Sequence, residues 1–198
     1  MTGIVLIAAG ESRRLGTPKQ LLPWGGHTLL RHAAMTALSA ELGPVVVVLG
    51  ANESTCRTAL EGLPLQLLHH PDWASGMGGS IAAGVRELQK LPLEAVIVML
   101  CDQPFVTATT LRDLEVEWRL GGCEIVATRD QEIFGPPALF SSKCFDRLLE
   151  LQGHQGAKSL FHEELSLRFI DSPGASIDVD TPEAWNALVA VNTSPPLA

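Results

Sequence analysis

The sequence predicts an α/β fold with three layers, a Rossmann-like arrangement of a mostly parallel β-sheet with helices on both faces. Short apolar runs over residues 4–9, 45–49 and 95–100 are typical of parallel strands that are buried on both faces. Segments of helical periodicity lie between these runs, and alternating strands and helices indicate a parallel sheet. A chain of 198 residues is long enough for one such core.

In the first half of the chain we expect three helices and one further strand. The helices are predicted over residues 28–39, 53–60 and 80–90, and the strand over residues 65–68. Thr28 and Asn52 are the expected N-caps of the first two helices, because short polar side chains can accept from the free N–H groups of a first turn.

In the second half we expect two helices, one strand and an irregular segment, followed by a C-terminal helix. The helices are predicted over residues 107–120 and 142–152, the strand over residues 124–128, and a turn with a short extended segment over residues 134–140. The last helix is predicted to start with Thr181 as N-cap and Pro182 at its first position.

Composition places the chain among globular proteins, with 46% hydrophobic and 18% charged residues. A formal net charge of −8 disfavours nucleic acid as a partner, because affinity for the phosphate backbone comes from Lys and Arg. No apolar run approaches the ~20 residues of a membrane span, and no signal peptide is recognised. The four cysteines form no C-x-x-C pair. We expect one domain over residues 1–191, a flexible tail over residues 192–198 and a cytoplasmic protein.

A polar loop with three cations follows the first predicted strand. Arg13, Arg14 and Lys19 lie close together, in a chain whose acidic residues outnumber its basic ones. Beyond the carboxyl end of a parallel strand, a glycine turn such as that at Gly10 can bring backbone N–H groups to a phosphate. Neither a P-loop nor a G-x-G-x-x-G fingerprint is present. The loop is either an anion site or a solvated basic loop.

A carboxylate stands at the end of the apolar run over residues 95–100. Asp102 needs a partner in that position, because an unpaired buried charge is costly. Mg²⁺ takes one or two carboxylates together with substrate phosphates. Asp102 is therefore a candidate magnesium ligand, and the alternative is that it caps a turn beside Pro104.

The stretch from Leu6 to Gly26 matches the pattern L-x-A-A-G-x-S-x-R-x-G-x-x-K-x-L-L-P-W-G-G. This pattern resembles the opening signature of the nucleotidyltransferases that act on the molybdenum cofactor, most closely the cytidylyltransferase branch. The resemblance implies a fold of the nucleotide-diphospho-sugar transferase type, with a Gly10 loop that wraps the nucleotide phosphates. It also implies that Arg14 and Lys19 contact the triphosphate.

The same resemblance implies further nucleotide and metal contacts. A segment of the type W-x-x-G-M-x-x-S forms part of the nucleotide pocket in that family, and Trp73 begins the matching segment here. An Asp-x-Pro aspartate binds Mg²⁺ in the family, which gives that role to Asp102. The aspartate before Thr-Pro is the second metal ligand, which is Asp180 here, with Asp178 as the alternative. The nucleotide-binding residues expected on this basis are Ala8, Ala9, Gly10, Arg14, Lys19, Gly76, Met77, Ser80 and Asp102.

Acceptor contacts are implied by two other family-like segments. Gly135 and Pro137 belong to a Gly-x-Pro stretch near the acceptor. Lys158 ends a G-H-Q-G-A-K segment, and it either meets a substrate phosphate or lies on a helix surface. His154 stands in that segment where the family usually has an acid, which leaves the role of His154 open.

The activity implied is transfer of CMP from CTP to the terminal phosphate of molybdopterin or molybdenum cofactor, with Mg²⁺ as cofactor and release of pyrophosphate. Arg14, Lys19 and Asp102 would be the catalytic residues. A phosphate monoester needs no strong base, because its second pKa near 6 leaves it mostly ionised at neutral pH.

CTP is favoured over GTP because the methyl group of Ala9 replaces a glycine that is usual in the guanylyl branch. The alternatives are a guanylyltransferase, another NTP transferase with a different phosphate acceptor, and a non-catalytic carrier of molybdenum cofactor. A molybdoenzyme or its maturation chaperone is a candidate protein partner.

Overall fold

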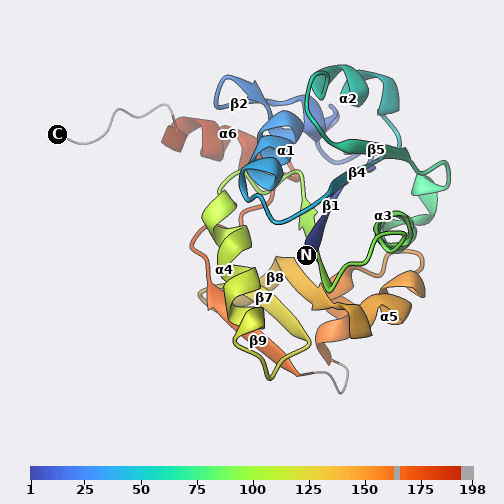
Figure 1. The fold of residues 1–198 in the computed structure, drawn as a ribbon. Coiled ribbons are helices and arrows are strands. Elements are labelled where there is room, and N and C mark those ends of the chain that lie inside the picture. The colour runs from blue at the N-terminus through green and yellow to red at the C-terminus, as the bar shows by residue number, and fades with distance from the viewer. Residues whose placement is uncertain (163–165, 193–198) are drawn as a thin grey trace.

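The computed structural model describes residues 1–162 and 166–192 and has one large β-sheet at its centre (Figure 1). Its seven strands lie in the order β5-β4-β1-β6-β8-β7-β9. Strand β8 runs antiparallel to β6 and β7, and the other neighbouring pairs are parallel. The strands are β1 (Thr2–Ala8), β4 (Val45–Leu49), β5 (Gln66–His69), β6 (Ala95–Leu100), β7 (Ile125–Asp130), β8 (Ile133–Ser141) and β9 (Leu167–Asp171).

Helices cover both faces of this sheet, as predicted. Along β1, Ile4 and Leu6 point into a core formed with α1, α2 and α4, whereas Val5 and Ile7 point into a core formed with α3 and α5. The helices are α1 (Leu29–Ser39), α2 (Glu53–Ala59), α3 (Met77–Leu88), α4 (Ala108–Arg119), α5 (Phe145–Leu149) and α6 (Pro182–Asn192). Figure 1 shows α1 and α4 on one side of the sheet and α3 and α5 on the other.

Short elements connect these layers. A two-stranded hairpin of β2 (Pro23–Trp24) and β3 (His27–Thr28) precedes α1. Three-residue 3-10 turns form η1 (Lys19–Leu21), η2 (Trp73–Ser75) and η3 (Ser142–Cys144), and a six-residue 3-10 helix forms η4 (Ala157–His162).

The first half of the chain follows the sequence prediction closely, with two corrections. Thr28 caps α1 by accepting from the N–H of Arg31 at 3.1 Å. Asn52 precedes α2, but its side chain makes no capping hydrogen bond, so that part of the prediction was wrong. Helix α3 begins at Met77, ahead of the predicted Ser80, because its first turn packs against a distant loop that accepts one of its free N–H groups.

The second half departs further from prediction. The helix predicted over residues 107–120 is confirmed as α4, and Thr107 is its N-cap, accepting from the N–H of Thr110. Residues 134–140, predicted to begin with a turn, lie inside the nine-residue strand β8. The helix predicted over residues 142–152 is replaced by η3 and the five-residue α5. Strand β9 was not predicted, because its residues have no strong strand pattern and pair with the distant β7.

Helix α6 begins as predicted, with the Thr181 hydroxyl accepting from the N–H of Ala184 at 3.2 Å. Its Trp185 packs against Trp24 of the β2-β3 hairpin, which joins the two ends of the described chain. The tail predicted over residues 192–198 lies outside the described residues, apart from Asn192 at the end of α6. In the part of the chain that the structure describes, no helix has the length and apolar character needed to cross a membrane.

Candidate active site

Three segments meet at the carboxyl ends of the adjacent parallel strands β1 and β6. The loop after β1 carries Arg14 and Lys19, and the turn after β6 carries Asp102. The segment before α6 joins them, because the N–H of Val179 donates to the carbonyl of Asp102 at 3.1 Å. That hydrogen bond brings Asp180 next to the two loops.

Four predicted residues form a charge cluster here, which we define as Arg14, Lys19, Asp102 and Asp180. The Lys19 ammonium contacts the Asp102 carboxylate and lies 2.8 Å from Asp180 Oδ1. The Arg14 guanidinium lies 2.7 Å from Asp180 Oδ2. The Lys19 and Asp102 side chains are 18% and 7% exposed, whereas that of Arg14 is 72% exposed. The cluster thus has a buried pair and a rim open to solvent.

The neighbouring charges set the protonation of this cluster. Burial lowers the pKa of Lys19, but the charge of Asp102 and the hydrogen bonds to Asp102 and Asp180 outweigh burial and raise it overall. Burial raises the pKa of Asp180, and the Lys19 and Arg14 interactions outweigh it and lower the pKa below its usual value. Lys19 is therefore an ammonium and Asp180 a carboxylate at neutral pH.

A third acid, Asp178, lies beside the cluster. Burial raises its pKa to about 6, and the charges of Asp102 and Asp180 add to that effect. Among the described residues, no group of three or more His, Cys, Asp or Glu side chains is arranged so that it could hold a metal ion. The Lys19 ammonium instead bridges the two carboxylates. Aspartate oxygens are nonetheless the donor type that fits Mg²⁺.

The loop that carries these cations is held by Gln20, which is fully buried. Its Nε2 donates to the carbonyls of Ala8 at 3.0 Å and Gly10 at 2.6 Å. The N–H of Lys19 donates to the hydroxyl of Ser12 at 3.1 Å, which closes the loop on itself. Sequence reasoning missed Gln20, because it occupies a variable position of the matched pattern.

One cavity lies beside the end of β1, and we call it the β1 cavity. It has a volume of about 340 Å³ and lies between the loop after β1 and the start of α3. Ala8, a predicted nucleotide-binding residue, does not line it and is buried in the core on the α1 face of the sheet. The wall includes the predicted nucleotide-binding residues Ala9, Gly10, Gly76, Met77 and Ser80, together with Trp73 and His154.

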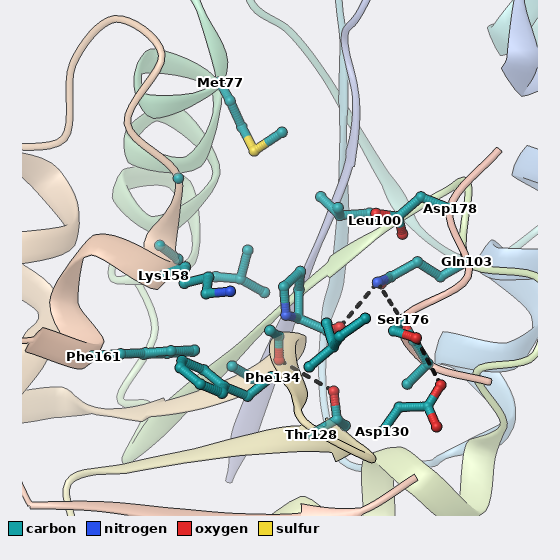
Figure 2. Close-up of a pocket in the computed structure, with 18 of the residues that line it drawn as sticks. Met77, Leu100, Gln103, Thr128, Asp130, Phe134, Lys158, Phe161, Ser176 and Asp178 are labelled. Carbon is teal, nitrogen blue, oxygen red and sulfur yellow. Dashed lines mark hydrogen bonds between the residues drawn. The ribbon is translucent and has the colours of Figure 1, made fainter. Parts of the chain in front are cut away.

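A second cavity, which we call the β8 cavity, lies between α3, β6, β8 and η4 (Figure 2). It has a volume of about 280 Å³ and apolar walls that include Phe134 and Phe161. Two of the predicted acceptor residues, Gly135 and Lys158, line it. The third, Pro137, is buried in β8 and does not line the cavity. Its neighbour Pro136 lines the cavity instead.

Polar groups gather around this apolar cavity. Figure 2 shows Lys158 pointing inward beside the aromatic rings, and its Nζ lies 4.5 Å from the centre of the Phe134 ring. On the other side, Asp130 accepts from the Ser176 hydroxyl at 2.7 Å, a hydrogen bond that lowers the pKa of Asp130. Asp178 also lines the cavity, so the cavity reaches the acid that faces the charge cluster.

Gln103 braces the β8 cavity and was also missed from the sequence. It is 4% exposed, and its Nε2 donates to the carbonyls of Pro136 and Ala175, each at 2.9 Å. Its Oε1 is buried and has no hydrogen-bond partner among the described residues. Gln103 is the variable residue of the Asp-x-Pro match, and Asp130 carries no sequence signal that would have marked it.

A mostly parallel sheet whose strand ends carry a glycine loop, paired cations and carboxylates beside two cavities is an arrangement typical of nucleotide-binding α/β proteins. The chain belongs to the family described as MobA-like NTP transferase domain, whose model matches residues 4–168. Membership confirms the resemblance and the fold class inferred from the sequence.

Three relatives differ in the functions that they are named for. Purine catabolism protein PucB of Bacillus subtilis (strain 168) is 32% identical over 92% of this chain and 93% of its own length. Nicotine blue oxidoreductase of Paenarthrobacter nicotinovorans is 43% identical over 59% of this chain and 57% of its own length. Molybdenum cofactor cytidylyltransferase of Escherichia coli (strain K12) is 27% identical over 90% of this chain and 91% of its own length.

Solved structures share the whole architecture. Rv0371c of Mycobacterium tuberculosis H37Rv is 28% identical and superposes with a TM-score of 0.82 over 96% of this chain and 97% of its own. The same protein in complex with manganese gives a TM-score of 0.78 over the same shares. A nucleotidyl transferase from Methanothermobacter, Mth528, is 19% identical with a TM-score of 0.83 over 98% of this chain and 99% of its own, which shows a common fold.

Proposed function

We propose that this protein transfers CMP from CTP to the terminal phosphate of molybdopterin or a molybdenum-cofactor-type acceptor, with Mg²⁺ as cofactor and release of pyrophosphate. The observation that carries the proposal is the charge cluster, which is linked to both cavities. Ser12 lines the β1 cavity and binds the N–H of Lys19, while Asp178 lines the β8 cavity and faces Asp102 and Asp180. A donor in one cavity and an acceptor in the other would meet at the cluster.

The donor triphosphate is assigned to the Gly10 loop and the cluster. Arg14 and Lys19 provide the cations, and Gln20 keeps the loop in place through two buried hydrogen bonds. Positive charge held beside the reacting phosphates stabilises the charge that develops on their oxygens during transfer. The preformed loop means that little reorganisation is needed when the nucleotide binds.

Mg²⁺ is assigned to Asp102 and Asp180, with Asp178 as the alternative second ligand. The manganese complex of Rv0371c supports a divalent cation in this family. When bound, the ion would offset the charge of the triphosphate. In the free chain Lys19 neutralises the same carboxylates, so the proposal requires them to exchange the ammonium for the ion.

The chain's own residues then act by positioning and charge. An oxygen of the acceptor phosphate attacks the α-phosphorus of CTP, a new P–O bond forms, and the bond to the departing pyrophosphate breaks. The acceptor is ionised at neutral pH, so no residue has to remove a proton. Lys19 and Arg14 hold the phosphates in line, and this positioning provides much of the rate enhancement.

The acceptor is assigned to the β8 cavity. Its aromatic walls and polar rim, with Lys158 on one side and Asp130 on the other, suit a flat heterocycle that carries a phosphate. The E. coli cytidylyltransferase supports a molybdopterin-type acceptor and CTP as donor. Ala9, buried at the wall of the β1 cavity, supports a pyrimidine over a purine. The proposal also includes a cytoplasmic location and, as a protein partner, a molybdoenzyme or its maturation chaperone.

The experiment is a transfer assay with product mass spectrometry. The protein is mixed with Mg²⁺, molybdopterin and either CTP or GTP, and pyrophosphate is measured. We expect pyrophosphate and a CMP-linked product with CTP. A GMP-linked product would assign the chain to guanylyl transfer. Absence of pyrophosphate with every nucleoside triphosphate would contradict a transferase and favour the carrier alternative.

A further inference from the structure

His154 lies in the wall of the β1 cavity, far in sequence from the other residues that form it. Its side chain is exposed, and no hydrogen bond to its imidazole is found among the described residues. The resemblance to the family left its role open, since an acid is usual at this position. An imidazole that faces a ligand cavity without a partner is available to a ligand.

Backbone contacts fix the segment that carries His154. The N–H of Gly78 donates to the carbonyl of Gly153 at 3.0 Å. A Cβ on Gly76 would lie 2.0 Å from the Gly153 oxygen, and a Cβ on Gly78 would lie 2.7 Å from the Gln152 nitrogen. Glycine is therefore required at both positions, and the loop at residues 152–154 is held against the start of α3.

The character of the β1 cavity indicates which part of a nucleotide it would take. Trp73, Ala9 and Met77 give it apolar walls. Its charged wall residues, Glu11 and Arg13, form an ion pair with each other at 2.6 Å. The four residues of the charge cluster are outside its lining. The triphosphate is thus expected at the cluster and the base in the β1 cavity.

We infer that His154 is a specificity-determining residue that contacts the base of the nucleotide. This inference rests on the proposed function, because it needs the β1 cavity to bind the donor. An imidazole N–H can donate to the adjacent acceptors O2 and N3 of cytosine. The N1–H and N2–H₂ groups of guanine offer this donor no acceptor on the corresponding edge. His154 therefore favours a cytosine base over a guanine base.

The test is isothermal titration calorimetry of the full chain, with Mg²⁺ and CTP, GTP or inorganic tripolyphosphate. His154→Ala should weaken CTP binding by about threefold to tenfold, the range of one neutral hydrogen bond, and should leave tripolyphosphate unchanged. His154→Asp should lower the preference for CTP over GTP further. His27→Ala, an exposed histidine in β3, is the matched control and should bind like the wild type. Melting temperatures check that each variant is folded.

The outcomes separate this inference from the proposed function. An unchanged ratio of CTP to GTP affinity in both His154 variants would overturn the inference alone. Equal weakening of CTP, GTP and tripolyphosphate would also overturn it, because it would indicate a phosphate contact or a structural role. A wild-type protein that binds no nucleoside triphosphate would overturn the proposed function, and the inference with it.

Discussion

Gln20 lies beneath the loop that borders the β1 cavity and donates from Nε2 to the carbonyls of Ala8 and Gly10. Gln103 lines the β8 cavity and donates from Nε2 to the carbonyls of Pro136 and Ala175. Both glutamines are buried. Gln20 reaches groups 10 and 12 residues away, whereas Gln103 reaches groups 33 and 72 residues away. The same type of contact therefore holds a local loop beside the β1 cavity and joins three distant segments around the β8 cavity.

This difference has a consequence for specificity. The β1 cavity takes its wall mainly from residues 7–13 and residues 73–80, so the proposed donor site is built largely from two segments of the chain. The β8 cavity depends on a strand, a turn and the segment before α6 keeping their relative positions. We expect changes near the β8 cavity to alter acceptor use while donor use is retained.

The largest expected effect is that of Asp102→Asn, which acts where the two sites meet. Loss of its charge removes the proposed metal ligand, and kcat for pyrophosphate release should fall by about 10²–10³-fold or more. Lys19 keeps its contact with Asp180, so the fold should persist. The measurement is a steady-state pyrophosphate assay with CTP and molybdopterin.

The control for this variant is Asp113→Asn, an exposed aspartate on α4. It should keep wild-type turnover. If Asp102→Asn also turned over like the wild type, the charge cluster would not be the catalytic centre. The β1 and β8 cavities could then not be assigned to donor and acceptor by their position relative to it.

The next effect concerns the two glutamines, which allow a matched pair of variants. Gln20→Leu and Gln103→Leu each leave two carbonyls without their donor, which should cost about 1–3 kcal/mol of stability. Gln20→Leu should raise the KM for CTP, and Gln103→Leu the KM for molybdopterin. The stability is measured by urea unfolding and each KM by titrating one substrate at saturation of the other. An equal rise of both KM values in both variants would contradict the claim that Gln20 supports the CTP site and Gln103 the molybdopterin site.

The smallest effect is expected for Lys158→Met, which keeps the apolar stem and removes the charge beside Phe134. The KM for the phosphorylated acceptor should rise about tenfold, or about 1.4 kcal/mol, with the KM for CTP unchanged. Lys143→Met, at an exposed site in η3, is the control. A rise in the KM for CTP instead would move Lys158 to the donor side.

The sequence predicted best the elements that depend on local patterns. The strands β4 and β6 and the N-caps Thr28 and Thr107 depend on local patterns, namely apolar runs and capping residues. The carboxylate at Asp102 could be singled out because a charge after a buried strand is costly.

The remaining features arise from contacts between distant residues. Strand β8 contains a Gly-Pro-Pro sequence that favours a turn locally, yet the residues before it pair with β7 and the residues after it pair with both β6 and β7. Helix α3 starts early because Gly78 meets Gly153. Such pairings leave no periodic signal in the sequence, and the same is true of Gln103 and Asp130 in the β8 cavity.

The most direct test of the central claim, that the charge cluster is a magnesium–triphosphate site, is thermal unfolding with CTP in the presence and absence of Mg²⁺. A ligand at a hundredfold its Kd adds about 2.7 kcal/mol to the native state. We predict that CTP raises the melting temperature of the wild type only when Mg²⁺ is present, and that Asp102→Asn loses this rise. An equal rise without Mg²⁺, or a rise retained in Asp102→Asn, would contradict the assignment.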